Sequence, residues 1–138
     1  YCQGAATHLT VGVLVDTAGD DRYIAWGVAQ GTGHDLAVGV LYDVSGNDYY
    51  ASDLLSQGAG NDNGLGILVD AEGNDMYIAK GENVRGDGNE SRNFGSIGIF
   101  IDAGGKDEYS KPGENNSIWI GKKYGVGVDG EGDVKWLK

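Results

Sequence analysis

Aspartate occupies two equivalent positions in a segment that the chain repeats. The segment reads GVLVDTAGDDRY at 12–23 and returns at 39–50, 66–77 and 98–109, with a weaker fifth copy at 125–136. The first position holds Asp16, Asp43, Asp70, Asp102 and Asp129. The second position, five residues later, holds Asp21, Asp48, Asp75 and Asp107, with Val134 in the fifth copy. Carboxylates repeated at turns can accept hydrogen bonds from main-chain N–H groups, or they can supply oxygen ligands to Ca²⁺.

The spacing of the first aspartate position predicts the fold. Its intervals are 27, 27, 32 and 27 residues, a period typical of stacked repeats that cannot bury their apolar faces alone. Glycine stands four residues before each of these aspartates, and the residues between are mostly β-branched, which indicates a short buried strand. We therefore expect an all-β chain, a β-solenoid (parallel β-helix) of about five coils. A β-propeller blade would need ~40–45 residues.

Stacking would place equivalent residues of successive coils side by side, ~4.8 Å apart. The residues seven positions after the first aspartates, namely Tyr23, Tyr50, Tyr77, Tyr109 and Trp136, would then form an aromatic stack. The aspartates would form two columns of like charge, which repel by ~1 kcal/mol per neighbouring pair even in bulk water. Two interpretations remain open. Each aspartate can cap its own turn, or Ca²⁺ ions can lie between turns and neutralise both columns.

The second half of the repeat carries a further turn signature. The segment QGTGHD at 30–35 matches QGAGND at 57–62, which adds Asp35 and Asp62 to the candidate ligands. The five extra residues of the longest interval fall mostly after Gly88, in NESRNFGS. This predicts a loop insertion around 86–96 in one coil of a single domain covering 1–138, and we expect that domain to be a fragment of a longer repeat protein.

The turn segments resemble a known repeat family. GDDRY at 19–23, GNDYY at 46–50, GNDMY at 73–77 and GAGND at 58–62 are similar to the Ca²⁺-binding Gly/Asp nonapeptide repeats of RTX toxins and secreted proteases. The resemblance implies a parallel β-roll, with ligands at Asp21, Asp48, Asp75 and Asp107 in one turn and at Asp35 and Asp62 in another. The opening Gly-Gly of that motif is absent here, and the period is 27 rather than 18. The segments also resemble Gly/Asp/Tyr repeats of uncharacterised bacterial surface proteins, which imply no activity.

Composition and charge restrict the partners. The net charge of −11 argues against nucleic acid and against insertion into or binding to anionic membranes, because both need a positive field. The single cysteine, Cys2, excludes an internal disulfide, and no apolar run approaches the ~18 residues of a membrane span. His8 and His34 fit turn positions at the surface. Multivalent cations are the partners that such an acidic chain favours.

Catalytic motifs are not found in the sequence. It has no G-x-S-x-G, no H-E-x-x-H and no phosphate-binding loop, and a glycosidase would need two carboxylates in unlike environments rather than many in like ones. We expect a non-enzymatic chain. Trp26 and Trp119 lie outside the tyrosine series, and capping of the core is favoured over a role as sugar platforms.

These observations favour a structural or adhesive module of a secreted or cell-surface protein, stiffened by bound Ca²⁺. The expected metal ligands are Asp16, Asp21, Asp43, Asp48, Asp70, Asp75, Asp102, Asp107, Asp35 and Asp62. Exposed strand edges at the ends of the stack would allow self-association end to end into filaments, or contact with other surface components. The alternatives are a carbohydrate-binding or polysaccharide-degrading β-helix and a metal-free scaffold for protein binding.

Overall fold

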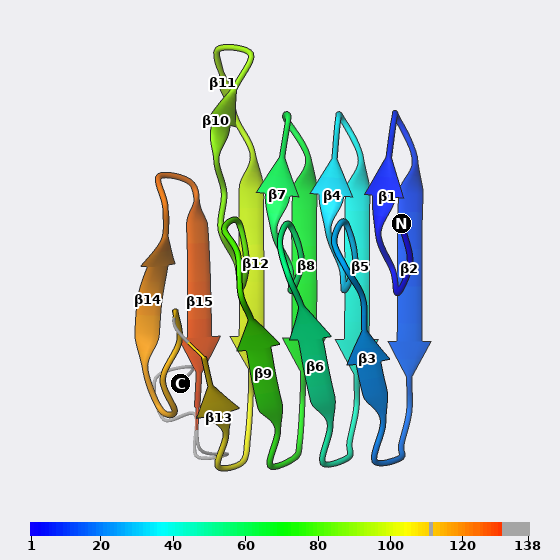
Figure 1. Ribbon diagram of the computed structural model, residues 1–138, viewed down its shortest axis with the longest axis vertical. Helices are drawn as coiled ribbons and strands as arrows, with labels where there is room; N and C mark the ends of the chain where they lie inside the picture. Colours follow the sequence, from blue (N-terminus) through cyan, green and yellow to red (C-terminus); the bar gives the residue numbers. More distant parts are fainter. Residues whose placement is uncertain (111, 131–138) are drawn as a thin grey trace, which may run out of the picture.

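The computed structural model describes residues 1–110 and 112–130, which form strands and turns without a helix. The chain winds into a stack of coils in which strands at equivalent positions of successive coils pair in parallel (Figure 1). The predicted all-β solenoid of about five coils is therefore confirmed. Within the described residues, nothing forms a helix that could cross a membrane.

One long strand per coil builds the largest sheet. These strands are β2 (Val11–Asp16), β5 (Val38–Asp43), β8 (Leu65–Asp70), β12 (Ile97–Asp102) and β15 (Gly125–Asp129), all parallel to one another. β14 (Ile118–Gly121) runs antiparallel to β15 and ends the sheet. The register pairs Asp16 with Asp43, Asp43 with Asp70, Asp70 with Asp102 and Asp102 with Asp129. The 27-residue spacing thus produces the predicted column of aspartates.

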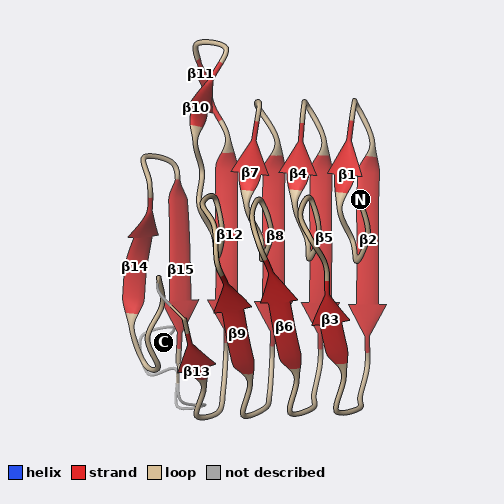
Figure 2. Ribbon diagram, in the orientation of Figure 1, coloured by secondary structure: helices blue, strands red, loops and turns tan. Residues whose placement is uncertain are grey.

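Two smaller sheets form a second layer over one face of this sheet (Figure 2). One contains β3 (Arg22–Ile24), β6 (Tyr49–Ser52), β9 (Met76–Ala79) and β13 (Glu108–Tyr109). The other contains β1 (Ala6–Thr7), β4 (Gly33–His34) and β7 (Gly60–Asn61). Each coil is therefore flattened into two layers. The insertion predicted around 86–96 forms a hairpin of β10 (Glu90–Ser91) and β11 (Phe94–Gly95) that projects beyond the stack.

The glycine before each long strand's apolar triplet is required by the contact between the layers. A Cβ atom on Gly39 would lie 2.1 Å from the carbonyl oxygen of Thr32 in the opposite layer. Gly31, in that layer, has a φ of +77° and faces the main chain of Ile67 in the same way. At this end of the coil the two layers meet main chain to main chain, with no room for a side chain between them.

Side chains fill the other end of the coil. Leu41, Leu68 and Phe100 point inward from the long strands and are fully buried. Against them the rings of Tyr23, Tyr50, Tyr77 and Tyr109 stack in sequence, with centroids 4.8, 4.8 and 5.0 Å apart. The predicted aromatic stack is confirmed for these four rings, and Trp136 lies outside the described residues.

The two tryptophans that lie outside the tyrosine series differ in position. Trp119 packs against Phe100 and Tyr109, with ring centroids 5.5 and 5.9 Å apart, and occupies the space that a side chain on Gly127 would need. It caps the core, as predicted. Trp26 is 77% exposed, so its predicted capping role is wrong. Trp26 lies two residues beyond the end of β3.

Candidate metal centre

The first aspartate column points into the protein. Side chains alternate along the long strands, so the aspartate that ends each strand faces the same way as the leucine or phenylalanine two residues before it. Asp43, Asp70, Asp102 and Asp129 are buried at the ends of their strands. A buried carboxylate is costly unless hydrogen bonds or opposite charges compensate it.

The tyrosine stack supplies part of that compensation. The hydroxyl group of Tyr23 donates to Oδ2 of Asp43 at 2.5 Å, and that of Tyr50 donates to Oδ2 of Asp70 at 2.7 Å. Tyr109 donates to Oδ2 of Asp129 at 2.5 Å and approaches Oδ2 of Asp102 at 3.2 Å. The aromatic stack therefore has a polar role in addition to packing, because the hydroxyl groups of Tyr23, Tyr50 and Tyr109 bind the first aspartate column.

The second aspartate column forms a ladder between coils. The main-chain N–H of Asp21 donates to Oδ1 of Asp48 at 2.7 Å, that of Asp48 to Oδ1 of Asp75 at 2.6 Å, and that of Asp75 to Oδ1 of Asp107 at 2.7 Å. Asn115 continues the ladder by accepting from the N–H of Asp107 at 2.6 Å. Each carboxylate thus holds the equivalent residue of the preceding coil rather than its own turn.

Hydrogen bonds do not use all of the buried oxygens. Oδ2 of Asp48, Oδ2 of Asp75 and Oδ1 of Asp70 have almost no contact with solvent and no hydrogen-bond partner. These three residues are at most 2% exposed. An orphaned buried carboxylate oxygen needs a proton or a cation, because water cannot reach it.

The two columns converge into groups of three carboxylates. Asp48, Asp70 and Asp75 offer oxygen atoms that all lie within 4.8 Å of one another, and Asp75, Asp102 and Asp107 form a second group of the same kind. All five residues are buried, and Asp75 belongs to both groups. We call these five residues the aspartate cluster. Each group combines one carboxylate of the first column with two of the second, so it exists only where successive coils meet.

The electrostatics of the cluster match its geometry. Burial, followed by the charge of Asp70, raises the pKa of Asp75 to about 8. Burial also raises the pKa of Asp70 to about 7, with the charge of Asp43 adding to it. The pKa of Asp102 rises to about 9 through burial and the charges of Asp107 and Asp70, and that of Asp48 to about 6, mainly through burial. Each of these carboxyl groups therefore favours proton or cation binding near neutral pH.

The donor set selects a class of ion. The cluster contains only carboxylate oxygens, which suit hard cations, and no imidazole or thiolate that would favour zinc or copper. Ca²⁺ takes 6–8 oxygen ligands in flexible geometry, whereas Mg²⁺ demands an octahedron and keeps several of its waters. Carboxylates that bind through one or both oxygens at variable distances suit the flexible coordination of Ca²⁺. The residues present therefore fit Ca²⁺ better than Mg²⁺.

Three further predicted ligands lie on the same columns, nearer the first coil. Asp43 is buried and binds Tyr23, whereas Asp16 and Asp21 are partly open to solvent. In the described part of the chain, none of the three joins a group of three carboxylates within 4.8 Å. Of the ten predicted ligands, the structure brings five together: Asp48, Asp70, Asp75, Asp102 and Asp107.

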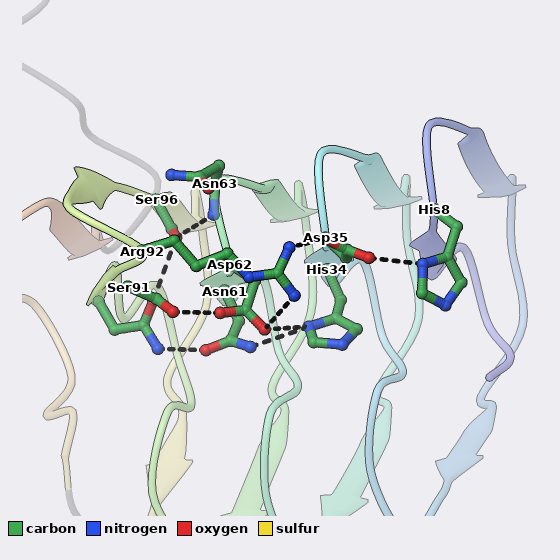
Figure 3. A network of polar contacts seen from close by, with 10 residues as sticks. His8, His34, Asp35, Asn61, Asp62, Asn63, Ser91, Arg92 and Ser96 are labelled. Carbon is green, nitrogen blue, oxygen red and sulfur yellow. Dashed lines mark hydrogen bonds and ion pairs between the residues drawn. The ribbon is translucent and has the colours of Figure 1, made fainter.

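Asp35 and Asp62, predicted as ligands in a second turn, lie at the opposite end of the coil in a different environment (Figure 3). A guanidinium nitrogen of Arg92 lies 2.5 Å from Oδ1 of Asp35, and a second lies 3.9 Å from Oδ2 of Asp62. Ser91 also donates to Asp62. The hairpin of β10 and β11 thus folds its arginine back over two coils. A cation from the protein itself compensates these aspartates.

The predicted surface turn position is confirmed for His8, whose side chain is 72% exposed, whereas His34 lies in β4 with its side chain only 21% exposed. Nδ1 of His8 lies 2.5 Å from Oδ2 of Asp35, and His34 lies one coil further along, 3.8 Å from Asp62. Desolvation opposes ionisation of Asp35, but hydrogen bonds with His8 and Arg92, together with their charges, keep its pKa below the ordinary value. At this end of the coil the carboxylate of Asp35 is therefore charged and paired.

Arg85 is a buried charged residue that was not among the predicted site residues. It is fully buried at the place that Gln30 and Gln57 occupy in earlier coils. Its Nε donates to Oε1 of Gln57 at 2.8 Å, and its guanidinium also donates to Ser110 and to the carbonyl of Pro112. The alignment of RGDGNE at 85–90 with QGAGND at 57–62 was the available signal, because it places Arg85 on the glutamine column.

Comparisons with known proteins add no family to this description. The chain matches no family model, and no curated protein or solved structure shows significant similarity to it. The aspartate cluster and its surrounding hydrogen bonds are therefore the basis for any functional inference.

Proposed function

We propose that this chain is a structural β-solenoid module whose coils are held together by Ca²⁺ bound at the aspartate cluster. One observation carries the proposal: buried carboxylate oxygens of Asp48, Asp70 and Asp75 lack hydrogen-bond partners and belong to residues that converge within 4.8 Å. A single divalent ion would neutralise most of the charge of such a group. Because each group joins carboxylates from successive coils, the ion would act as a clamp between them.

Protons offer the competing form of compensation. The raised pKa values of Asp70 and Asp75, about 7 and 8, mean that protons would occupy part of the cluster at neutral pH if no metal were present. A bound proton lets the carboxyl group donate a single hydrogen bond, whereas one Ca²⁺ ion contacts several oxygens at 2.3–2.6 Å. We therefore propose that, above pH 7, Ca²⁺ at millimolar concentration neutralises the negative charge of the aspartate cluster.

A binding measurement tests this function directly. After dialysis against EDTA and then metal-free buffer at pH 8, isothermal titration calorimetry with CaCl₂ should give about two ions per chain, one for each group of three carboxylates. Titration with MgCl₂ should give weaker binding, since Mg²⁺ retains its waters. The absence of any saturable Ca²⁺ binding up to 10 mM would remove the metal from this function.

The proposed setting is the cell surface or the extracellular medium. Extracellular modules bind Ca²⁺ with dissociation constants of about 10⁻⁴–10⁻³ M, which matches the free Ca²⁺ outside cells. The net charge of −11 and the single cysteine are compatible with that setting. We propose a non-enzymatic role as a rigid spacer or adhesive unit. The outer edges of β2 and β3, which pair with no described strand, would allow end-to-end contacts with other surface components.

Carbohydrate binding is a second candidate, favoured by the position of Trp26. Its indole is 77% exposed beside β3, where the aromatic face can stack on a sugar ring. Titration of soluble polysaccharides should then change the tryptophan fluorescence saturably in the parent chain and not in Trp26→Ala. An unchanged fluorescence in both proteins would exclude this candidate.

A further inference from the structure

The outer face of the six-stranded sheet is apolar across its whole width. Side chains alternate along each strand, so the residues between the inward glycine, leucine and aspartate positions point away from the second layer. This outer face consists of Val11, Val13, Val15, Val38, Val40, Tyr42, Leu65, Ile67, Val69, Ile97, Ile99, Ile101, Val126, Val128, Ile118 and Ile120. None of them carries a charge, and all but Tyr42 are aliphatic.

The described residues leave this outer face open. Val11, Val13 and Val15 are 70%, 60% and 57% exposed, and Ile97, Ile118 and Ile120 are exposed as well. The central residues are half-buried, because neighbours in the same column cover their flanks. Parallel sheets are usually covered on both faces, whereas here the two short sheets cover only the inner one (Figure 2).

The dimensions of the outer face suit a dimer. Six strands spaced ~4.8 Å apart, with about five residues of ~3.3 Å each, give a face of roughly 25 by 17 Å. This flat footprint of roughly 425 Å² is about half of the ~800 Å² that each partner contributes to a standard interface, and the side chains that rise from it, 52–74% exposed along β2, at Ile97 and along β14, add further accessible area. Large apolar patches of this kind on a monomer usually mark a site of interaction.

The regularity of the outer face identifies its occupant as a second copy. Three columns run across the strands, the middle one made of Val13, Val40, Ile67, Ile99 and Val126, and they form three ridges with two grooves between them. A copy related by a two-fold axis presents the same ridges, and a shift of half a column spacing places ridges in grooves, as in sheets that pack ~10 Å apart.

Charge points to the same occupant. Each chain has a net charge of −11, but the acidic side chains lie at the turns and in the aspartate cluster, not on the outer face. A positively charged partner would find no carboxylate to pair with on the outer face. An equally flat apolar sheet, in contrast, could pack against it. We propose that two copies of this chain dimerise by packing the outer faces of their six-stranded sheets against each other.

Analytical ultracentrifugation of the full chain from 1 to 200 µM tests the dimer. The parent chain should sediment as a monomer–dimer equilibrium, and higher NaCl should favour the dimer because it screens the repulsion between acidic chains. Ile67→Lys, at the centre of the outer face, should abolish the dimer. Its matched control is Ile78→Lys, a half-buried isoleucine of the same coil that points outward from β9 in the other layer and should dimerise as the parent chain does.

A second pair keeps the test decisive if Ile67→Lys fails to fold, as judged by circular dichroism. Val13→Lys on the outer face and Ile24→Lys on the four-stranded sheet replace residues of equal exposure, 60% and 59%, in the same coil. Val13→Lys should weaken dimerisation at least tenfold and Ile24→Lys less than twofold. A monomeric parent chain, or open-ended oligomers insensitive to the lysines on the outer face, would overturn the proposal.

Discussion

The main-chain N–H of Asp48 donates a hydrogen bond to Oδ1 of Asp75, one coil further along the stack, at 2.6 Å. The other oxygen of the same carboxylate, Oδ2 of Asp75, is buried without a hydrogen-bond partner. One side chain therefore sets the spacing between two coils and also offers an oxygen to both groups of the aspartate cluster. Asp75 is the residue at which coil stacking and the proposed metal binding are coupled.

Substitution Asp75→Asn should abolish the stabilisation by Ca²⁺ while leaving the fold intact. The amide oxygen of asparagine can still accept the N–H of Asp48, but the variant removes a carboxylate that both groups of three share. At pH 8 in EDTA its melting temperature should equal or exceed that of the parent chain, because a buried negative charge is gone. Thermal melts followed by circular dichroism with 5 mM CaCl₂ and with EDTA measure both effects.

Asp20→Asn is the matched control for this substitution. Asp20 is an exposed neighbour in an equivalent turn, where its Oδ1 accepts from the main-chain N–H of Asn47 at 2.8 Å, a bond that asparagine can preserve. This variant should keep the full Ca²⁺-dependent rise in melting temperature. An equal loss in Asp20→Asn and Asp75→Asn would mean that only overall charge matters, which would contradict a localised site.

The metal-free protein should become less stable as the pH rises from about 4 to about 8. Burial raises the pKa of Asp75 to about 8 in the folded chain, above its ordinary value of ~3.9, so the folded state binds this proton more tightly than the unfolded state. The stabilisation is fully present below pH ~4 and is lost as the pH approaches 8. Urea unfolding in EDTA at pH 5, 6, 7 and 8 measures this slope.

The Asp75→Asn variant isolates the contribution of Asp75 to that slope. It should reduce the fall in the free energy of unfolding between pH 5 and pH 8, since one of the titrating carboxyl groups is missing. With 5 mM CaCl₂ the parent chain should gain most stability at pH 8 and least at pH 5, because Ca²⁺ competes with protons for the same oxygens. A Ca²⁺ effect that is largest at pH 5 would be inconsistent with binding at raised-pKa carboxylates.

Removal of one hydroxyl group should test the link between the tyrosine stack and the first aspartate column. Tyr50→Phe keeps the ring in its stack but leaves Oδ2 of Asp70 without its 2.7 Å donor. Loss of a buried hydrogen bond to a carboxyl group should lower the free energy of unfolding by about 1–3 kcal/mol. Tyr49→Phe, a neighbour that faces outward, should change it by less than ~0.5 kcal/mol. Chemical denaturation in EDTA compares the two variants.

A methyl group between the two layers should be poorly tolerated. The Cβ atom of Gly39→Ala would lie 2.1 Å from the carbonyl oxygen of Thr32, so the layers would have to separate at this coil. We expect a loss of more than ~2 kcal/mol, compared with less than ~1 kcal/mol for Val44→Ala, a half-buried residue of the same coil. Similar stabilities of the two variants in urea would contradict the main-chain contact between layers.

The repeat spacing was sufficient to predict the coil and both aspartate columns. Asp16, Asp43 and Asp70 recur every 27 residues, and the register pairs them as that period requires. The interval of 32 residues before Asp102 did not disturb the column, because the extra residues form the projecting hairpin of β10 and β11. The period is a local property of the sequence, and parallel stacking converts it directly into neighbours in space.

The partners of the carboxylates could not be predicted in the same way. Nothing in the repeat indicates that Asp75 accepts the N–H of Asp48 rather than one in its own turn, because this depends on where the turn lies relative to the preceding coil. The pairing of Arg92 with Asp35, 57 residues away in the sequence, depends on how the hairpin folds back. Asp35 and Asp62 share a turn signature with residues of the aspartate cluster. Their environment differs because the hairpin places Arg92 beside them.

The thermal stability of the parent chain with and without Ca²⁺ tests the proposed role of the aspartate cluster most directly. At pH 8, 5 mM CaCl₂ should raise the melting temperature by about 5–10 °C over that in EDTA, as expected for a ligand at about 5 to 50 times its dissociation constant. MgCl₂ at the same concentration should give a much smaller rise. An identical melting temperature in CaCl₂ and in EDTA would contradict Ca²⁺ binding between the coils.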